Sequence, residues 1–287
     1  MKLMSFVTPQ RATFGIVDGD RIFDLGPRLV HTCTDLKSVL CAGWVDRLPA
    51  LISGAPADFR VDEVSFLPVL PNPSRIFCAG LNYYAHRAEG NRPETTEPPI
   101  FIRLAQSQTG HGRPLVCPVE SDQLDFEGEL AVVIGKAGRR IAEEDALGYV
   151  AGMSCYNDGS VRDWQLATTQ WTAGKNFPAT GAFGPWLVTA DELSPARDLT
   201  LVTRLNGEEV QRTSTELMTF PMARLISFIS TFTTLVPGDV IVTGTPGGVG
   251  LRRTPPLYMK HGDEVEVEIE GLGVLRNSVV KERARHT

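Results

Sequence analysis

Three acidic residues occur where short apolar segments begin or end. Glu127 and Glu129, separated by one glycine, precede the apolar run 130–134, and Asp158 follows a second apolar run. Because side chains at i and i+2 of a β-strand project from the same face, residues 127 and 129 can direct both carboxylates toward one point. Three carboxylates around one point repel one another unless a cation lies among them, and oxygen ligands favour Mg²⁺, Mn²⁺ or Ca²⁺ over zinc. The spacing alone leaves open that these are surface acids at strand ends.

His86 and Glu89 form a second candidate group. They stand at i and i+3 in segment 83–90, for which a short helix ended by glycine is predicted, so their side chains share one helix face. A carboxylate that accepts a hydrogen bond from one imidazole nitrogen leaves the other nitrogen free to take a proton. A structural or surface histidine is the alternative for this residue.

Two further segments carry chemical groups in apolar or glycine-rich surroundings. Lys175 stands in the segment Gly174-Lys175-Asn176-Phe177 among glycine and apolar neighbours, where it could balance an anionic substrate or an enolate, although a surface lysine is the alternative. The glycine-rich segment 244–250 supplies backbone amides and the hydroxyl of Thr245, which could hold an anionic group. The segment lacks the Gly-Lys-Ser/Thr ending of a phosphate loop.

The elements that must position these groups are mostly short strands. Asp18-Gly19 between two apolar runs predicts a β-hairpin near the start of the chain, and the proline-containing stretch 68–73 predicts a linker. We therefore expect a small domain over residues 1–70 and a second domain over residues 71–287. The run 264–269 alternates between apolar and acidic residues, which is typical of a half-exposed strand. Apolar residues at helical spacing predict one helix over 221–231, so an α+β, β-rich protein is expected.

Composition narrows the classes of partner. The formal net charge is −6, and no basic cluster is present, which argues against nucleic acid or an anionic membrane as the main ligand. No apolar run approaches the roughly 20 residues that span a bilayer, and no signal peptide is predicted. Five scattered cysteines suit reduced thiols in a cytoplasm. A small molecule is the expected ligand.

Taken in order along the chain, these motifs resemble the fumarylacetoacetate hydrolase family, and specifically its branch of bacterial acylpyruvate hydrolases and 2-hydroxyhepta-2,4-diene-1,7-dioate isomerases. The resemblance covers roughly residues 75 to 280. It rests on Asn82-Tyr83 with His86 and Glu89, on Asp125-Phe126-Glu127-Gly128-Glu129-Leu130, on Asn157-Asp158 with Arg162-Asp163, on Gly174-Lys175, and on Gly244-Thr245-Pro246. Each motif is weak alone, and their common order and spacing make the combination specific.

The resemblance implies a mixed β-sandwich roll with a small N-terminal α/β domain and a homodimeric assembly. It also implies a divalent metal, usually Mg²⁺ and otherwise Mn²⁺, held by Glu127, Glu129 and Asp158. Relatives of this kind act on 2-oxo and 2,4-dioxo acids. The first expectation is therefore a metal-dependent hydrolase that cleaves a C–C bond in an acylpyruvate or fumarylpyruvate-like acid, as in aromatic catabolism.

Alternatives remain at this point. A 2-oxo acid decarboxylase of the oxaloacetate type or a 2-oxo diacid isomerase is the close second, because a shared fold does not choose the reaction. A ureidoglycolate lyase and a metal-binding protein without turnover rank lower.

The resemblance also assigns roles to individual residues. His86 assisted by Glu89 would deprotonate water, and Lys175 would stabilise the developing oxyanion. Arg103 stands where many relatives have Lys-Pro, and it could grip a substrate carboxylate. Gln211 and Thr245 are the other expected substrate contacts.

Overall fold

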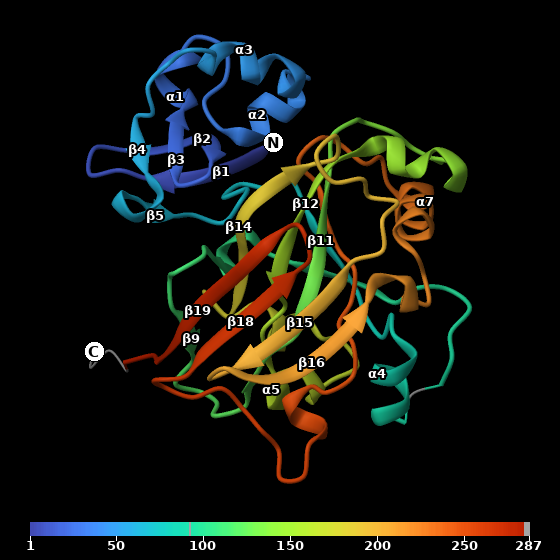
Figure 1. Cartoon of the computed structure of the whole chain (residues 1–287). Coiled ribbons are helices and arrows are strands. Elements are labelled where there is room, and N and C mark those ends of the chain that lie inside the picture. Colours follow the sequence, from blue (N-terminus) through green and yellow to red (C-terminus); the bar gives the residue numbers. More distant parts are fainter. Residues whose placement is uncertain (92, 284–287) are drawn as a thin grey trace.

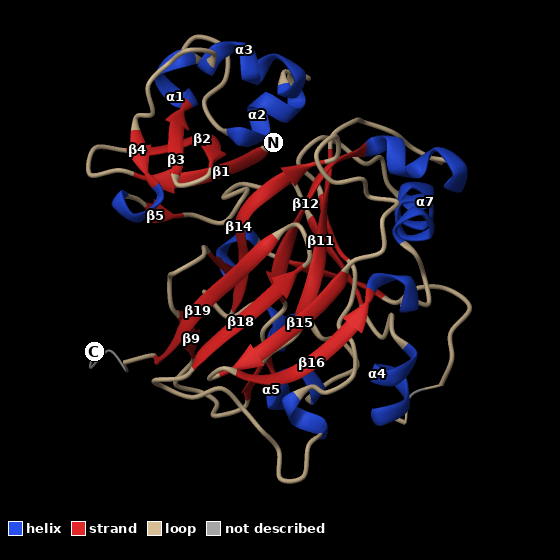
Figure 2. Ribbon diagram, in the orientation of Figure 1, coloured by secondary structure: helices blue, strands red, loops and turns tan. Residues whose placement is uncertain are grey.

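The computed structural model describes residues 1–91 and 93–283 and places most of the short apolar runs in β-sheets (Figure 1). Strand β18 (Glu264–Ile269) shows the predicted alternation, because Val265, Val267 and Ile269 are buried while the residues between them are partly exposed. The fold is the expected β-rich mixture of sheets and short helices, as Figure 2 shows.

The larger sheet has twelve strands and runs through both halves of the molecule. In spatial order its main path is β4 (Phe59–Arg60), β3 (Arg21–Asp24), β2 (Ala12–Asp18), β1 (Lys2–Val7), β14 (Gly181–Thr189), β12 (Val150–Asn157), β11 (Gly128–Ile134), β17 (Val240–Val242), β6 (Ile76–Ala79) and β7 (Ile100–Arg103). Off this path, β5 (Ser65–Phe66) pairs with β1, and β8 (Gln108–Thr109) pairs with β14.

A five-stranded sheet covers one face of this larger sheet. Its order is β16 (Glu208–Ser214), β15 (Thr200–Leu205), β18, β19 (Gly273–Lys281) and β9 (Leu115–Cys117). Leu130 and Val132 of β11 and Leu201 of β15 belong to one buried cluster, so the two sheets share a core. A two-stranded ladder of β10 (Leu124–Asp125) and β13 (Ser160–Val161) lies at the end of the sandwich that carries the candidate site.

The N-terminal segment extends the large sheet. Lys2 and Leu3 of β1 pair in antiparallel fashion with Val188 and Leu187 of β14. The predicted hairpin is present as β2 and β3, whose pairing runs to Asp18 and Arg21. Figure 1 shows this segment as a separate lobe above β14, with three short helices on it: α1 (Leu25–Arg28), α2 (Leu36–Cys41) and α3 (Leu48–Ile52). The domain boundary near residue 70 stays a prediction.

The remaining helices are short apart from one. They are α4 (Tyr84–Glu89), α5 (Arg162–Leu166), α6 (Thr172–Lys175) and α7 (Met222–Phe232), with single-turn or slightly longer 3₁₀ segments η1 (Val45–Arg47), η2 (Val61–Glu63), η3 (Ala105–Ser107), η4 (Glu143–Tyr149), η5 (Thr215–Leu217) and η6 (Gly250–Arg252). Leu225, Ile226 and Ile229 of α7 are buried, which confirms the predicted apolar stripe as core. Of these helices and 3₁₀ segments, only α4, α5, α6 and η6, at one end of the sandwich, contribute residues to the site described below.

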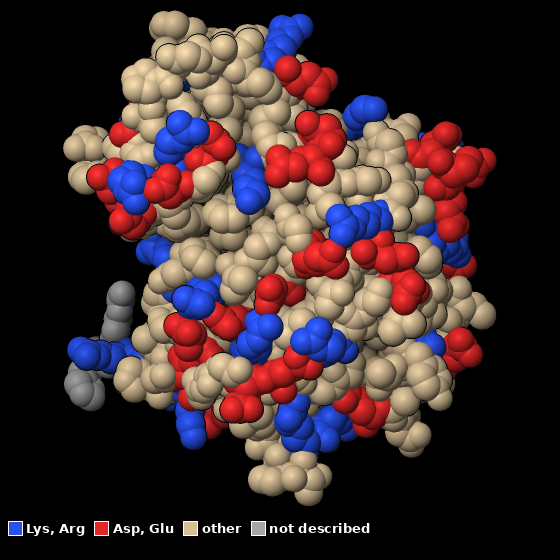
Figure 3. All heavy atoms as spheres, viewed as in Figure 1, with Lys and Arg blue, Asp and Glu red and all other residues tan. Residues whose placement is uncertain are grey.

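The surface carries charges of both signs. Figure 3 shows acidic and basic side chains interspersed on the face that it draws, without a continuous basic field. Among the described residues, no helix combines the length and the apolar character that crossing a membrane requires. The expected homodimer stays a prediction, which light scattering on the purified protein can test.

Candidate active site

The three acidic residues meet because β11 and β12 pair in antiparallel fashion. Gly128 at the start of β11 lies opposite Asn157 at the end of β12, and Asp158 N donates to Glu127 O at 2.9 Å beyond the paired strands. The Asn157 side chain accepts from Glu127 N at 3.0 Å, which fixes the backbone before the strand. One ligand atom from each of Glu127, Glu129 and Asp158 lies within 4.8 Å of the others, and all three residues are buried.

Lys175 is the central cation of this acidic cluster. Its Nζ donates to Glu127 Oε2 at 2.8 Å and to Asp158 Oδ2 at 2.5 Å, and it lies over the Phe101 ring at 5.0 Å. Tight packing of α6 against α5 places it there, because a Cβ on Gly174 would come within 2.3 Å of Gln165 N. The predicted surface alternative for Lys175 is therefore wrong, since the residue is only 2% exposed.

Two arginines provide the other compensating charges. Arg162 Nη1 pairs with Glu127 Oε1 at 2.6 Å and its Nε pairs with Asp125 Oδ2 at 2.7 Å. Arg103 pairs with Asp158 and also donates to Gly159 O at 2.9 Å. Each of these guanidinium groups is buried, and buried charges are tolerated when they are paired and hydrogen-bonded.

This arrangement pushes the pKa values of the cluster apart. Burial raises the pKa of Glu127, but Lys175 and Arg162 outweigh that effect and hold the pKa at about 2. For Glu129, burial and then the neighbouring charges of Asp158 and Glu127 raise the pKa well above its ordinary value. Burial alone would lower the pKa of Lys175, yet Asp158 and Glu127 raise it overall, so the amine keeps its proton at neutral pH.

Glu129 is the acid whose charge the protein compensates least. Its Oε2 accepts from Gly244 N at 2.5 Å, and within the described ranges its other oxygen accepts no hydrogen bond. Gly244 has a φ of 101°, and a Cβ there would come within 2.7 Å of Asn82 Cβ, so glycine is required for this amide to face Glu129. A set of three buried carboxylates with one oxygen lacking a donor fits a hard divalent cation such as Mg²⁺ or Mn²⁺.

His86 and Glu89 lie together on α4 as their spacing predicted. His86 Nδ1 is 2.7 Å from Glu89 Oε1, and the second oxygen of Glu89 accepts from Gly248 N at 2.8 Å. The glycine-rich segment therefore fixes the carboxylate that orients the imidazole. With Nδ1 donating to Glu89, Nε2 is the nitrogen available as a base.

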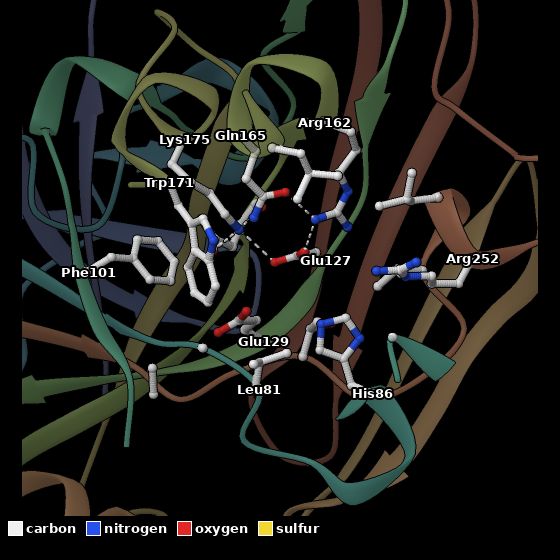
Figure 4. Close-up of a pocket in the computed structure, with 18 residues that line it drawn as sticks. Leu81, His86, Phe101, Glu127, Glu129, Arg162, Gln165, Trp171, Lys175 and Arg252 are labelled. Atoms are coloured by element: carbon white, nitrogen blue, oxygen red, sulfur yellow. Dashed lines mark hydrogen bonds and ion pairs between the residues drawn. The ribbon is translucent and has the colours of Figure 1, made fainter. Parts of the chain in front are cut away.

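These groups line one pocket between the sheet ends and the short helices (Figure 4). Its volume is about 60 Å³, which is room for a few water molecules. In Figure 4 Phe101 and Trp171 lie on one side of Glu127, while His86 and Arg252 lie on the other. The pocket thus has an aromatic side and a basic side, with the carboxylates between them.

The three expected substrate contacts lie in different places. Thr245 lines the pocket and donates to Gly128 O at 3.0 Å. Gln211 does not line it; its amide accepts from Gly128 N at 3.0 Å and donates to Thr245 Oγ1 at 2.9 Å. Arg103 also lies outside the pocket lining, behind Asp158. Direct substrate binding by Gln211 and Arg103 stays a prediction, and their contacts make both of them positioning residues for the loops and acids around the pocket.

Several of the residues that line the pocket were not identified from the sequence. Arg162 appeared only as part of a motif, and the lining residues Phe101, Gln165, Trp171 and Arg252 were not singled out as site residues. Arg162 had a detectable signal, because it stands four residues after Asp158 in the same motif. The other four come from segments whose approach to the pocket depends on the tertiary fold.

Comparison with known proteins adds family evidence to this geometry. A family model described as "Fumarylacetoacetate (FAA) hydrolase C-terminal" matches residues 75–280. The chain is 45% identical over 220 residues to oxaloacetate tautomerase FAHD2A, mitochondrial, of Bos taurus, covering 76% of this chain and 70% of that protein. It is 46% identical over 220 residues to the Homo sapiens protein of the same name, with the same coverage.

Solved structures agree over nearly the whole chain. A fumarylacetoacetate hydrolase from Exiguobacterium antarcticum superposes with a TM-score of 0.85 at 34% identity, covering 98% of this chain and 100% of that one. A maleylpyruvate hydrolase from Sphingobium sp. SYK-6, solved in complex with manganese(II) ion and pyruvate, gives a TM-score of 0.82 at 27% identity, covering 99% and 100%. The similarity therefore includes the N-terminal segment as well as the part matched by the family model.

Proposed function

Because this chain belongs to the fumarylacetoacetate hydrolase family, we propose that its site interconverts the keto and enol forms of a small 2-oxo diacid of the oxaloacetate type. The observation that carries this proposal is the pairing of a three-carboxylate cluster with a glutamate-oriented imidazole in one pocket. Relatives at 45% and 46% identity bear the name oxaloacetate tautomerase, which supports this reaction over the C–C bond hydrolysis first expected from the sequence.

In this proposal Glu127, Glu129 and Asp158 hold Mg²⁺ or Mn²⁺. When bound, the cation supplies positive charge that polarises the 2-oxo carbonyl and acidifies the neighbouring C–H bond. Glu129 stands in β11, while Glu127 directly precedes β11 and Asp158 directly follows β12. The pairing of these two rigid strands holds the three carboxylates near one point.

His86 is the proposed general base. Its Nε2 takes the proton from the carbon next to the carbonyl and returns it to the carbonyl oxygen, so the substrate changes only the position of one proton and one double bond. Glu89 holds the imidazole in the tautomer that leaves Nε2 unprotonated. Lys175, protonated at neutral pH, adds positive charge beside the oxygen on which negative charge develops.

The aromatic lining of the pocket supports the proposed role of Lys175. The aromatic side formed by Phe101 and Trp171 keeps water away from one side of Lys175, and a low local dielectric strengthens the charged interactions of the amine.

Cleavage of a C–C bond by hydrolysis is the second candidate. The His86–Glu89 pair that would move a substrate proton could equally deprotonate a water molecule. A structural relative that covers this whole fold bears the name maleylpyruvate hydrolase. Decarboxylation of oxaloacetate needs no water, and it would appear as pyruvate formation.

One set of assays separates these reactions. The Mn²⁺-loaded protein is mixed with enol oxaloacetate, the ultraviolet absorbance of the enol is followed, and pyruvate is measured in the same sample. If the protein is a tautomerase, the enol absorbance should fall faster than in the absence of protein, and no additional pyruvate should form. If it is a decarboxylase, pyruvate should form at the rate at which the absorbance falls. Faster cleavage of an acylpyruvate, with no effect on oxaloacetate enolisation, would refute the tautomerase proposal in favour of the hydrolase.

A further inference from the structure

Among the described residues that line the pocket, Arg252 is the one basic residue whose charged group has no protein partner. It ends η6, is exposed, and lines the same pocket as His86. Figure 4 shows its guanidinium directed toward the pocket from the side on which His86 lies. In residues 1–91 and 93–283, no carboxylate lies within ion-pair distance of this group, and no hydrogen bond from its side chain is present.

The other cations near the pocket are already engaged. Lys175 pairs with Glu127 and Asp158, and Arg162 pairs with Glu127 and Asp125. The next residue of the chain, Arg253, donates to the carbonyl oxygens of Gly248 and Val210, so it holds the loop instead of facing a ligand. Arg252 therefore differs from its neighbours in having a full set of free donors.

The backbone that carries Arg252 is fixed beside Arg162. Asp125 accepts from Gly250 N at 2.8 Å and Leu251 N at 2.9 Å, and the same carboxylate pairs with Arg162 Nε. Arg162 Nη2 is buried and has no hydrogen-bond partner within the described part of the chain. This side of the pocket is thus rich in donors and short of acceptors, and a held backbone presents the flexible Arg252 side chain to it.

We propose that Arg252 binds the carboxylate of the substrate that is remote from its 2-oxo acid group, and that it thereby selects diacids over their uncharged analogues. This rests on the proposed function, in which Glu127, Glu129 and Asp158 serve the 2-oxo acid end through the metal. A guanidinium suits a carboxylate because its planar fork can donate two parallel hydrogen bonds. The residue is thus a determinant of specificity, distinct from the acid–base pair.

The test compares oxaloacetate with 2-oxosuccinamate, which has the same shape but a neutral amide in place of the remote carboxylate. In Arg252→Gln, kcat/KM for oxaloacetate should fall on the order of 10- to 100-fold, which is the value of one charged hydrogen-bonded contact. The value for 2-oxosuccinamate should change less than about twofold, since the amide carries no charge for a guanidinium to pair with. Arg252→Lys should restore part of the preference. Arg139→Gln, which removes an exposed arginine outside the pocket lining, should leave both substrates unchanged.

Binding separates failure of this inference from failure of the proposed reaction. Calorimetry on the Mn²⁺-loaded protein gives the Kd of each compound for the wild type and Arg252→Gln. One possible outcome is that the wild type binds oxaloacetate more tightly than 2-oxosuccinamate, that Arg252→Gln loses this preference, and that the protein enolises neither compound. This outcome would refute the proposed reaction and support the carboxylate-binding role of Arg252. Absence of a wild-type preference, or an equal loss for both compounds in the variant, overturns the role of Arg252 whatever the turnover.

Discussion

Replacing Lys175 with methionine should strongly destabilise the metal-free protein. Lys175 Nζ lies 2.8 Å from Glu127 Oε2 and 2.5 Å from Asp158 Oδ2 in a buried site, so the variant leaves two buried carboxylates short of one positive charge. Removing one partner of a buried ion pair typically costs about 3–5 kcal/mol. Because Arg162 still pairs with Glu127 and Arg103 still pairs with Asp158, we expect the lower end, about 3 kcal/mol, and a fall in Tm of about 6 °C.

Thermal and guanidinium unfolding in EDTA measure this loss. Lys136→Met is the matched control, because Lys136 is exposed and forms no ion pair with the described residues. Added Mn²⁺ should stabilise Lys175→Met more than the wild type, since the amine and the cation compete for the same carboxylate oxygens. If Lys175→Met unfolds like Lys136→Met in EDTA, the charge reasoning about this cluster is wrong.

Three further predictions concern the metal, the base and pH. Glu127→Gln should abolish Mn²⁺ binding and turnover, and EDTA should remove oxaloacetate binding from the wild type; calorimetry that finds either binding intact contradicts the metal assignment. His86→Ala should lower the enolisation rate by about 10²- to 10⁴-fold with the Kd for Mn²⁺ unchanged, and a parallel loss of metal affinity would point to a structural role instead. Burial, and then the charge of Arg276, lower the pKa of His111, so its contribution to stability is present above about pH 6.5 and is lost as the pH falls through the folded-state value. His111→Gln should flatten this acid side of the stability profile, and equal profiles for both proteins would exclude His111 as the cause.

Much of the site was predictable because its parts obey local rules. The i, i+2 spacing on a strand placed Glu127 and Glu129 together, and the return of the chain in the next strand brought Asp158 to them. The i, i+3 spacing on a helix did the same for His86 and Glu89. Each of these groupings needs only one element or one pair of neighbouring strands.

The rest depends on contacts between distant segments. Arg103 stands in β7 at the edge of the large sheet, and the fold brings Asp158 against its guanidinium. The sequence alone could not show that Arg103 forms an ion pair with this buried carboxylate. Gln211 is similar, because it lies in β16, a strand that was not predicted, and the second sheet brings it over Gly128. Both residues are buried and have internal partners in the fold. Sequence spacing carries no information on burial of that kind.

The charges of the site also explain why metal should precede substrate. Asp125, Glu127 and Asp158 are hydrogen-bonded to three cations, Arg103, Arg162 and Lys175, and Glu129 lies beside them. When Glu129 is ionised, four carboxylates face three cations, so this buried cluster is negative by one charge and repels the 2-oxo acid end of the substrate. Burial weakens the screening of that repulsion by salt. A bound divalent cation makes the charge of the cluster positive. The carboxylates that hold the cation therefore favour an anion at their end of the pocket only when the cation is bound, which is why removing the metal should remove substrate binding and not merely the chemical step.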